Sequence, residues 1–419
     1  MLRVYLSGLW NEMSEKGRKT LPWDLLRGGF EGAGNAYVGT FALLIAIRYF
    51  DCSIAMKSLI ASGVAVGQGI SFLYATYSHY LIRKWNVEAA IPLFLASACC
   101  LACSWVETPQ VYAALCFLAA MLFMLRSPAM TAIYRENYKR TVRGQVFSFG
   151  VLVGALSSAL LCYSGGKFLD LGLERFRVLY FFFGLILLGA AVAVLRIPSE
   201  RKPREDLPNP FSYFTILKKD PTFVYFLATW FVFGSANLTL LPQRFEYVSQ
   251  QEYGFALSPG MVALVVTVIP DLVRMLMVLP MGWLFDRMNF IVLRMVINLF
   301  FLAYFILFFH ATSLGMLMIS SALLGIGFAG GAISWNLWVT KFATASDTAK
   351  YMAMHTFFTG IRGVLGPYSG YWVATRYSIP AVAWFSVGFT CLSLLMMLPL
   401  VPQGAPYDYK RADTPVSEI

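Results

Sequence analysis

Charged side chains are scarce in this sequence of 419 residues. Aspartate, glutamate, lysine and arginine together make up 13% of the chain, about half of their share in a typical water-soluble domain. Hydrophobic residues make up 58%. A composition with so few charges argues against a water-soluble protein and predicts an integral membrane protein of the helical class.

Several common functional motifs are also missing. There is no G-x-x-x-x-G-K-[ST] loop for nucleotide phosphates, and no Ser/His/Asp or metal-ligand constellation in a soluble domain, so we expect neither an enzyme nor a cofactor. The first 20 residues are polar and charged, which does not fit a cleavable signal peptide. The seven cysteines are odd in number and lie mostly in apolar stretches, so we expect no disulfide framework.

Long apolar stretches fill most of the chain. A helix needs about 20 residues to cross the hydrocarbon core of a bilayer, and twelve stretches offer approximately that length. The expected spans are Leu25–Tyr49, Ala55–Ile82, Ala89–Val106, Val111–Tyr134, Gln145–Ser164, Val178–Leu195, Phe223–Leu241, Pro259–Phe285, Phe290–Phe309, Leu314–Val339, Ala349–Thr375 and Ile379–Leu400.

One charged, proline-rich segment, 198–221, divides these spans six and six. We therefore expect an N-terminal segment 1–24, a six-helix bundle 25–197, a cytoplasmic linker, a second bundle 222–401 and a tail 402–419. Apolar residues at helical spacing before residue 14 suit a helix on the inner membrane face, and a disordered tail is the alternative.

The two halves repeat each other at an offset of about 200 residues. Three short matches support the repeat: 163–165 with 368–370, Asn35 with Asn237, and 84–86 with 287–289. Six spans per copy make both copies enter from the same side, as two pseudo-symmetric bundles.

The net charge of +11 is mainly a signal of membrane topology. Lysine and arginine concentrate in alternate segments between the spans, which predicts that both termini are cytoplasmic. We expect a multi-pass protein of the inner or plasma membrane, monomeric, with no nucleic-acid partner.

Two inner loops carry recognisable motifs. The loop after the eighth span reads Gly282-Trp-Leu-Phe-Asp286-Arg287, and the fifth span is preceded by Arg143-Gly-Gln-Val-Phe-Ser. Together with the 6+6 arrangement, these motifs resemble those of the major facilitator superfamily. The equivalent loop of the first half, with Arg83 and Lys84, lacks the aspartate.

The resemblance implies an inner gate. Asp286 is expected near Arg143, at the start of the fifth span, where free backbone N–H groups favour an anion. Arg83 or Lys84 is expected to pair with Asp347 on the other side, and Gly282 and Arg287 complete the motif. The alternative is that these are solvated loop charges.

Ionisable groups at bilayer depth point to function because they are costly unless a cavity or a partner surrounds them. Glu31 and Arg126 both lie roughly 12–13 Å inside their spans, at about 1.5 Å per residue. The resemblance implies that spans 1, 4, 7 and 10 line a central cavity. The two residues are expected either as a permanent pair, or as a proton carrier and a ligand for an anionic solute.

The second half has its own buried ionisable groups. Arg274 and Arg362 lie roughly 18 Å deep, near mid-membrane. Asp271 shares a helix face with Arg274, and His355 shares one with Arg362. Asp271 and His355 are candidates for proton coupling, and for His355 the alternative is a hydrogen-bonded packing residue.

Arginine at several such positions predicts a solute with a carboxylate or phosphate group, since the guanidinium fork binds either one bidentately. Neutral side chains at similar depth are candidates for the rest of the solute: Asn35, Gln68, Asn237, Asn336 and Trp335, with Trp230 and Trp338 as further aromatic candidates that equally suit packing.

The resemblance implies a secondary active transporter of a small solute, working by alternating access of its two bundles and coupled to protons. Other interpretations are export of drug-like compounds, a membrane sensor on the same scaffold, a membrane-embedded enzyme, and copper transport through the methionine pairs of the second half.

Overall fold

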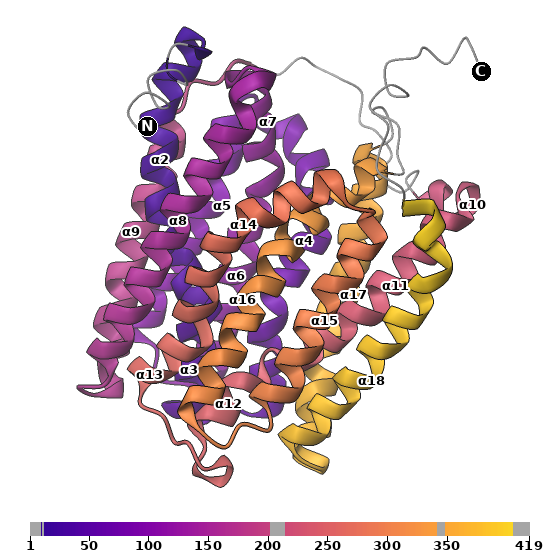
Figure 1. Cartoon of the computed structure of the whole chain (residues 1–419). Helices are drawn as coiled ribbons and strands as arrows, with labels where there is room; N and C mark the ends of the chain where they lie inside the picture. Colours follow the sequence, from indigo (N-terminus) through magenta and orange to yellow (C-terminus); the bar gives the residue numbers. More distant parts are fainter. Residues whose placement is uncertain (1–9, 11, 202–213, 342–347, 405–419) are drawn as a thin grey trace.

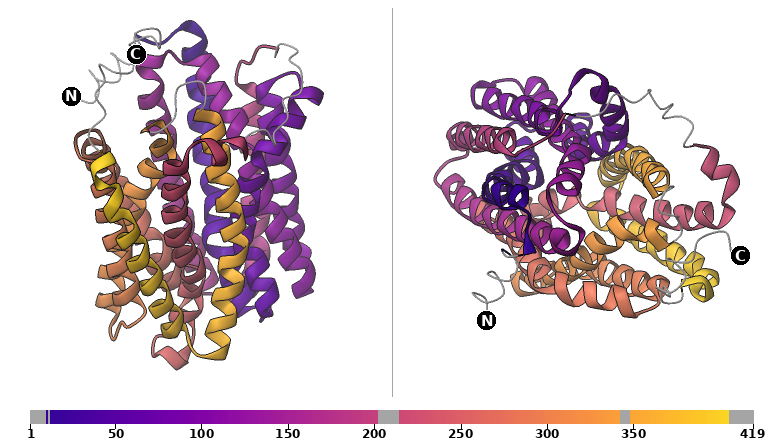
Figure 2. Two further views of the ribbon diagram at one scale, coloured as in Figure 1. Left: turned by 90° about the vertical axis from the view of Figure 1, so that its right-hand side faces the viewer. Right: turned by 90° about the horizontal axis from the view of Figure 1, so that it is seen from above.

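A computed structural model describes Trp10 and residues 12–201, 214–341 and 348–404. Within these ranges the chain is helical, and a single β-bridge joins Lys84 to Arg201. The long helices lie side by side and run between two ends of the molecule (Figure 1). Seen from above, the helices of the first half gather next to those of the second half (Figure 2).

Some spans of the first half consist of more than one helical segment. The segments are α2 (Glu15–Ala36), η1 (Tyr37–Phe41), α3 (Ala42–Arg48), α4 (Ile54–Leu81), α5 (Trp85–Ala102), η2 (Cys103–Trp105), α6 (Pro109–Leu125), α7 (Ser127–Asn137), α8 (Arg140–Leu169), η3 (Leu173–Arg175) and α9 (Phe176–Arg196).

The second half has a similar make-up. Its segments are α10 (Ile216–Lys219), α11 (Pro221–Leu240), α12 (Gln243–Ser249), η5 (Gln251–Tyr253), α13 (Pro259–Ala263), η6 (Leu264–Val268), α14 (Ile269–Arg287), α15 (Phe290–Phe308), α16 (Leu314–Leu337), η7 (Trp338–Lys341), α17 (Thr348–Arg376), α18 (Ile379–Met397) and η8 (Leu398–Gly404).

The same pairs of helices pack together in both halves. In the first half, α2 packs against α8 and α9, α4 against α6, and α5 against α9 and α6. In the second half, α11 packs against α17 and α18, α14 against α16, and α15 against α18 and α16. These are equivalent positions in an order of six spans, so the two halves share one architecture.

The first helix begins earlier than the sequence predicts. Helix α2 starts at Glu15, ten residues before the expected start of the span, because the Ser14 side chain caps it by accepting a hydrogen bond from the N–H of Gly17 at 3.1 Å. At the other boundary, the Asp220 side chain caps α11 by accepting from the N–H of Phe223 at 2.9 Å.

Eleven of the described helices are long and apolar enough to cross a membrane. The remaining expected span, Ala349–Thr375, corresponds to α17, which has 29 residues and is therefore long enough. Its composition is more polar because it contains His355 and Arg362. Helix α17 packs along α4 of the first half and α11 of its own half, so protein surrounds much of it.

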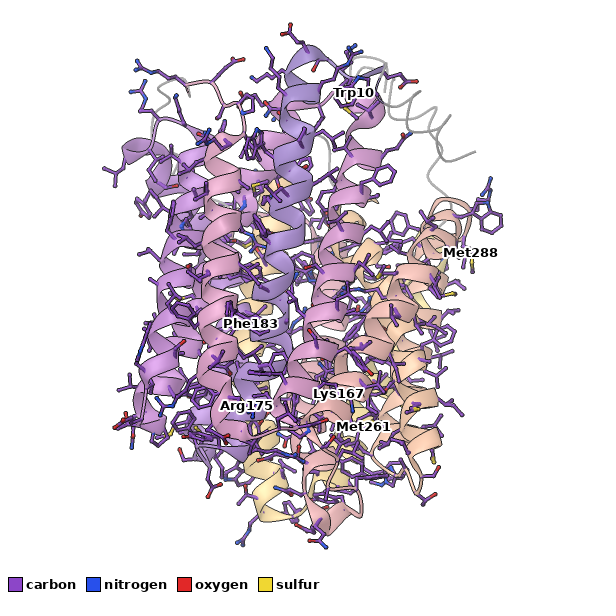
Figure 3. All side chains as sticks on the ribbon, turned by 90° about the vertical axis from the view of Figure 1, so that its left-hand side faces the viewer. Trp10, Lys167, Arg175, Phe183, Met261 and Met288 are labelled. Carbon is purple, nitrogen blue, oxygen red and sulfur yellow. The ribbon has the colours of Figure 1, made fainter. Side chains whose placement is uncertain are left out.

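The helices run between two ends of the molecule, which are named here by the chain segments that lie at them. We call the end where α2 begins and η8 ends the terminal end, and the opposite end the distal end (Figure 1). Figure 3 shows Trp10 near the terminal end, and Lys167, Arg175 and Met261 toward the distal end.

Polar contacts join the two halves at the distal end. Lys57 forms an ion pair with Glu246, and Arg48 donates to the backbone oxygens of Ser249, at 3.2 Å, and Leu257. Asp170 accepts a hydrogen bond from the N–H of Gly260 at 2.8 Å.

The deepest of these contacts joins Thr40 to Thr267, whose hydroxyl oxygens lie 2.6 Å apart. All of these hydrogen bonds and the ion pair lie in the distal half of the molecule. The halves are therefore closed against each other at the distal end.

Candidate functional site

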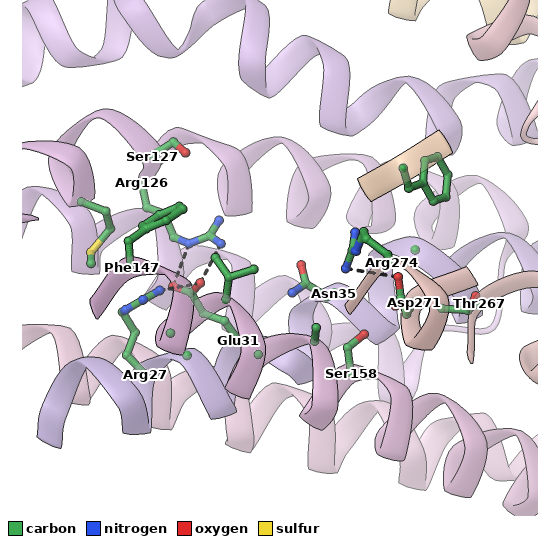
Figure 4. Close-up of a pocket in the computed structure, with 18 of the residues that line it drawn as sticks. Arg27, Glu31, Asn35, Arg126, Ser127, Phe147, Ser158, Thr267, Asp271 and Arg274 are labelled. Carbon is green, nitrogen blue, oxygen red and sulfur yellow. Dashed lines mark hydrogen bonds and ion pairs between the residues drawn. The ribbon is translucent and has the colours of Figure 1, made fainter. Parts of the chain in front are cut away.

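A cavity of about 490 Å³ lies between the two halves. Its volume falls within the range of about 300–1,000 Å³ that is usual for small-molecule sites. Two clusters of charged side chains face it, one from each half: Arg27, Glu31 and Arg126 from the first, and Asp271 and Arg274 from the second (Figure 4). The ionisable and polar residues that line it are Arg27, Glu31, Asn35, Arg126, Ser127, Thr131, Tyr134, Ser158, Arg244, Thr267, Asp271 and Arg274.

Exposure along the lining shows where the cavity opens. Ser158 and Val266, on its distal side, are buried, with 3% and 1% of their surface exposed. Ser127 and Thr131, closer to the terminal end, are exposed. Asn35 lies in the middle of the first span and is also exposed. The cavity is therefore accessible from the terminal end and closed at the distal end.

A proline places Arg126 at the edge of this cavity. Pro128 has no backbone N–H and interrupts the fourth span, so α6 ends at Leu125 and α7 begins at Ser127. Arg126 occupies the break and extends toward α2. Its guanidinium lies over the Phe123 ring, 3.7 Å from the centroid, and donates to the Phe123 carbonyl.

Arg126 and Glu31 form a two-fold ion pair. Arg126 Nε donates to Glu31 Oε1 at 2.8 Å, and Nη2 donates to Oε2 at 2.8 Å. Glu31 also accepts from Arg27 Nη1 at 2.8 Å. The carboxylate is therefore held by two guanidinium groups.

Arg27 continues this network toward the terminal end. Its Nη2 lies 2.8 Å from Asp24 Oδ1 and donates to the Tyr134 hydroxyl at 3.1 Å. The Tyr134 hydroxyl donates in turn to Asp24 Oδ1 at 2.9 Å. Two arginines and two acids are thus combined with no net charge, which makes the burial of all four tolerable.

A second charged group faces the cavity from the other half. Arg274 Nη2 lies 3.2 Å from Asp271 Oδ1, and Arg274 retains 35% exposure of its side chain. Arg244, on α12, lines the same side. Pro270 cannot donate a backbone hydrogen bond to the Val266 carbonyl four residues earlier, and Arg244 Nη1 donates to that oxygen at 3.0 Å.

Two π-helical segments border the cavity, one in each half. Segment η1 contributes Gly39 and segment η6 contributes Val266 and Thr267 to the lining. They meet through the contact of Thr40 with Thr267. Single π-helical turns within α-helices are frequent at functional sites.

The lining carries an excess of positive charge. Four arginines face the cavity against two acids, Glu31 and Asp271. Asp24 lies behind Arg27 and reduces the excess to one. Arg274 and Arg244 supply the surplus: Asp271 is the ion-pair partner of Arg274, whereas Arg244 donates to an uncharged backbone carbonyl and forms no ion pair with the described residues.

The structure separates the predicted site residues into two groups. Glu31, Asn35, Arg126, Asp271 and Arg274 line the cavity. Five others do not line it: Gln68, Asn237, Trp335, His355 and Arg362. The physical reason differs among them.

Arg362 and His355 point into the second bundle, where Arg362 donates to the Trp230 carbonyl and the His355 ring lies 5.2 Å from that of Trp335. Asn237 is on α11, with its side-chain oxygen buried. Gln68 is on α4, beside the contact of Gly69 with α17. The side chain of Asn336 lies outside the described residues.

The predicted gate is only partly visible. The side chains of Arg143 and Asp286 lie outside the described residues, as does Asp347. Arg83 is exposed, and Arg287 lies over the Trp283 ring of its own helix, 4.3 Å from the centroid.

Gly282 faces α16, where an added Cβ would be 3.6 Å from Ile333. The latch between Asp286 and the fifth span therefore stays a prediction.

Sequence reasoning missed two parts of the site. Asp24, Arg27 and Glu31 have the spacing of one helix face, so the signal for the network was present. Arg244 had no such signal, because it follows Pro242 in a segment that reads as an outer loop. In the structure this segment forms α12, and Arg244 reaches back to the cavity.

Comparisons with known proteins agree with this architecture. A family model described as Major Facilitator Superfamily matches residues 25–297 and 250–418. A search of curated proteins gives no significant match.

Solved transporter structures have a similar fold. A variant of the nucleoside transporter NupG aligns with a TM-score of 0.72 at 13% identity, covering 92% of this chain and 100% of that chain. The D-xylose-proton symporter gives 0.70 at 13%, covering 93% and 99%. The human organic anion transporter MFSD10 gives 0.63 at 14%, covering 92% and 100%.

Proposed function

The chain belongs to the major facilitator superfamily, and we propose that it carries a small organic anion by alternating access with coupled protons. Membership in the family confirms the predicted all-α fold of two six-helix bundles and the expectation of a membrane transporter rather than an enzyme. The anionic solute and the proton coupling are the proposed part.

The excess positive charge of the cavity supports an anionic solute. The four charges of Asp24, Arg27, Glu31 and Arg126 balance one another, whereas Arg274 and Arg244 together exceed the single charge of Asp271. A carboxylate or phosphate near Arg274 would restore neutrality. The guanidinium of Arg274 is suited to this role because it is the most exposed of the ion-paired groups in the cavity, and its fork can bind either anion.

Asp271 is the better candidate for the coupled proton. Both oxygens of Glu31 already accept from guanidinium groups, so protonation would break several charge-assisted bonds. Asp271 has a single ion pair, at 3.2 Å, with the group proposed to receive the solute. Binding of an anion to Arg274 would weaken that pair and favour a proton on Asp271, which links the two ligands.

The arrangement of the halves supports alternating access. The cavity opens at the terminal end only, which under the predicted topology is the cytoplasmic side. The opposite state requires the Lys57–Glu246 pair and the Asp170 contact to open.

Uptake into proteoliposomes tests the proposal. Radiolabelled carboxylates and organic phosphates are offered with and without a pH gradient, and neutral sugars and lipophilic cations serve as comparison solutes. A hydrogen bond to a charged group contributes about 1.5–3 kcal/mol, so Arg274→Gln is expected to raise the apparent KM for the transported anion by about 10- to 100-fold. Arg376→Gln, at the exposed end of α17, is the matched control.

Two results would contradict the proposal. Transport restricted to neutral or cationic solutes would exclude the anion and favour export of drug-like compounds. Uptake of an anion that ignores both the pH gradient and Asp271→Asn would exclude proton coupling through this residue.

A further inference from the structure

Two further arginines are buried inside the second bundle, away from the cavity. Arg294 on α15 is 3% exposed, and Arg362 on α17 is 6% exposed. Both lie against Trp230, Arg294 over its ring and Arg362 at its backbone carbonyl. In the described part of the chain neither forms an ion pair with a carboxylate, in contrast to Arg27 and Arg126.

Arg294 makes no hydrogen bond to the described residues. Its guanidinium lies over the Trp230 ring, 3.8 Å from the centroid, and 4.8 Å from that of Phe233. Its Nε is buried and has no hydrogen-bond partner. A guanidinium carries five N–H donors, so the aromatic contacts leave its hydrogen-bonding capacity unused.

Arg362 is only partly satisfied. It donates to the Trp230 carbonyl through Nη1 and to Thr359 Oγ1 at 3.0 Å through Nη2, while its Nε is buried without a partner. Trp230 therefore contacts both arginines, one through its ring and the other through its carbonyl. The indole N–H of Trp230 is also buried with no partner.

A buried histidine lies beside the two arginines and also has polar atoms without a hydrogen-bond partner. His355 is 1% exposed, and neither ring nitrogen has a partner among the described residues. Its ring lies 5.2 Å from each of the rings of Trp230, Trp335 and Trp338. The two arginines, the histidine and Trp230 thus form a buried cluster of donors walled by aromatic rings.

Charge balance identifies the ligand class. Two positive charges buried without a counter-ion are strongly unfavourable, because a buried charge depends on a partner to offset its lost hydration. Cation–π contact with an aromatic ring offsets only part of this cost. We propose that Arg294 and Arg362 bind a small inorganic monoanion of halide size within the second bundle.

The surroundings favour a small anion over a larger one. Arg362 fills the space above Gly234, where an added Cβ would collide with the guanidinium, so the bundle is tightly packed there. Residues exposed by 6% or less cannot reach a phospholipid headgroup at the surface. The cluster also shares no lining residue with the cavity between the halves, so this anion is distinct from the transported solute.

Halide titration of the purified full-length protein tests the site. Chloride replaces gluconate at constant ionic strength, and the melting temperature is followed. Iodide is titrated in parallel as a quencher of tryptophan fluorescence, because Trp230, Trp335 and Trp338 surround the cluster. We expect chloride to raise the melting temperature by several degrees with saturation, and iodide quenching to contain a saturable component that chloride displaces.

Variants connect these effects to the two arginines. Arg294→Gln is expected to abolish the saturable component, Arg294→Lys to retain part of it because the charge remains, and Arg376→Gln to leave it unchanged. Arg362→Gln provides an independent test if Arg294→Gln does not fold. A wild-type protein without a saturable halide effect, an unchanged chloride affinity in Arg294→Gln, or stabilisation by formate but not by chloride would each overturn the inference. None of these measurements depends on transport or on Arg274.

Discussion

Replacement of Glu31 by glutamine separates a structural role of the first charge network from a transport role. The carboxylate accepts from Arg126 through two bonds of 2.8 Å and from Arg27 through one of 2.8 Å. The Glu31 side chain is 8% exposed and that of Arg126 is 13% exposed, so little water can replace the lost charge. Glu31→Gln preserves the volume but leaves the network with two arginines and one acid.

The expected loss of stability follows from this imbalance. Removing one partner of a buried ion pair costs about 3–5 kcal/mol, and because the cavity admits some water we expect about 3 kcal/mol for Glu31→Gln. The double variant Glu31→Gln/Arg126→Gln restores neutrality, since Arg27 keeps Asp24. It should therefore be more stable than the sum of the single variants predicts, by about 1–3 kcal/mol.

Unfolding in mixed detergent micelles measures these free energies, and proteoliposome uptake is recorded for the same variants. Glu15→Gln is the control, because Glu15 and Lys19 form an exposed pair whose loss should change little. Additive effects of the two single variants, or a Glu31→Gln protein as stable as wild type, would refute the coupling. A double variant that folds normally and still transports would assign the pair a purely structural role.

Two further predictions concern the movement of the halves. Gly360→Ala places a Cβ 2.9 Å from the Gly69 Cα at the contact of α17 with α4, so it should separate the halves at the distal end and increase labelling of a cysteine introduced there by Ser258→Cys. Gly388→Ala, where nothing lies within 4 Å of the added Cβ, should leave the labelling unchanged. Equal labelling of both variants would contradict the prediction. Asp286→Asn should weaken the predicted latch, lower transport and expose the terminal-end loops to protease, and an unaltered protease pattern would count against the latch.

The architecture could be predicted from the sequence because membrane spans depend on length and composition. A bilayer requires about 20 apolar residues per helix, and the chain provides such stretches in two sets of six. The ends of the spans were less predictable. The start of α2 depends on the Ser14 cap, and the break at Arg126 depends on Pro128, two local features that hydrophobicity does not report.

The depth of a residue could be predicted, but not the direction in which its side chain points. Glu31 and Arg126 were expected at one level, and the structure pairs them. Arg274 and Arg362 were also expected at one level, yet Arg274 faces the cavity and Arg362 faces the interior of the second bundle. In a water-soluble helix the polar face indicates direction, whereas in a membrane the lipid and the bundle interior are equally apolar.

Glycine supplies the missing information on direction. An added Cβ at Gly28 would lie 2.9 Å from the Gly150 carbonyl, which fixes the face of α2 against α8 and turns the neighbouring Glu31 toward the cavity. On α11, Gly234 leaves the space that the Arg362 guanidinium occupies, so Arg362 turns inward. Close helix contacts in membranes rely on such small residues. The positions of glycine in a span therefore constrain where its charged residues point, and they distinguish a group that faces the cavity from one that faces the interior of a bundle.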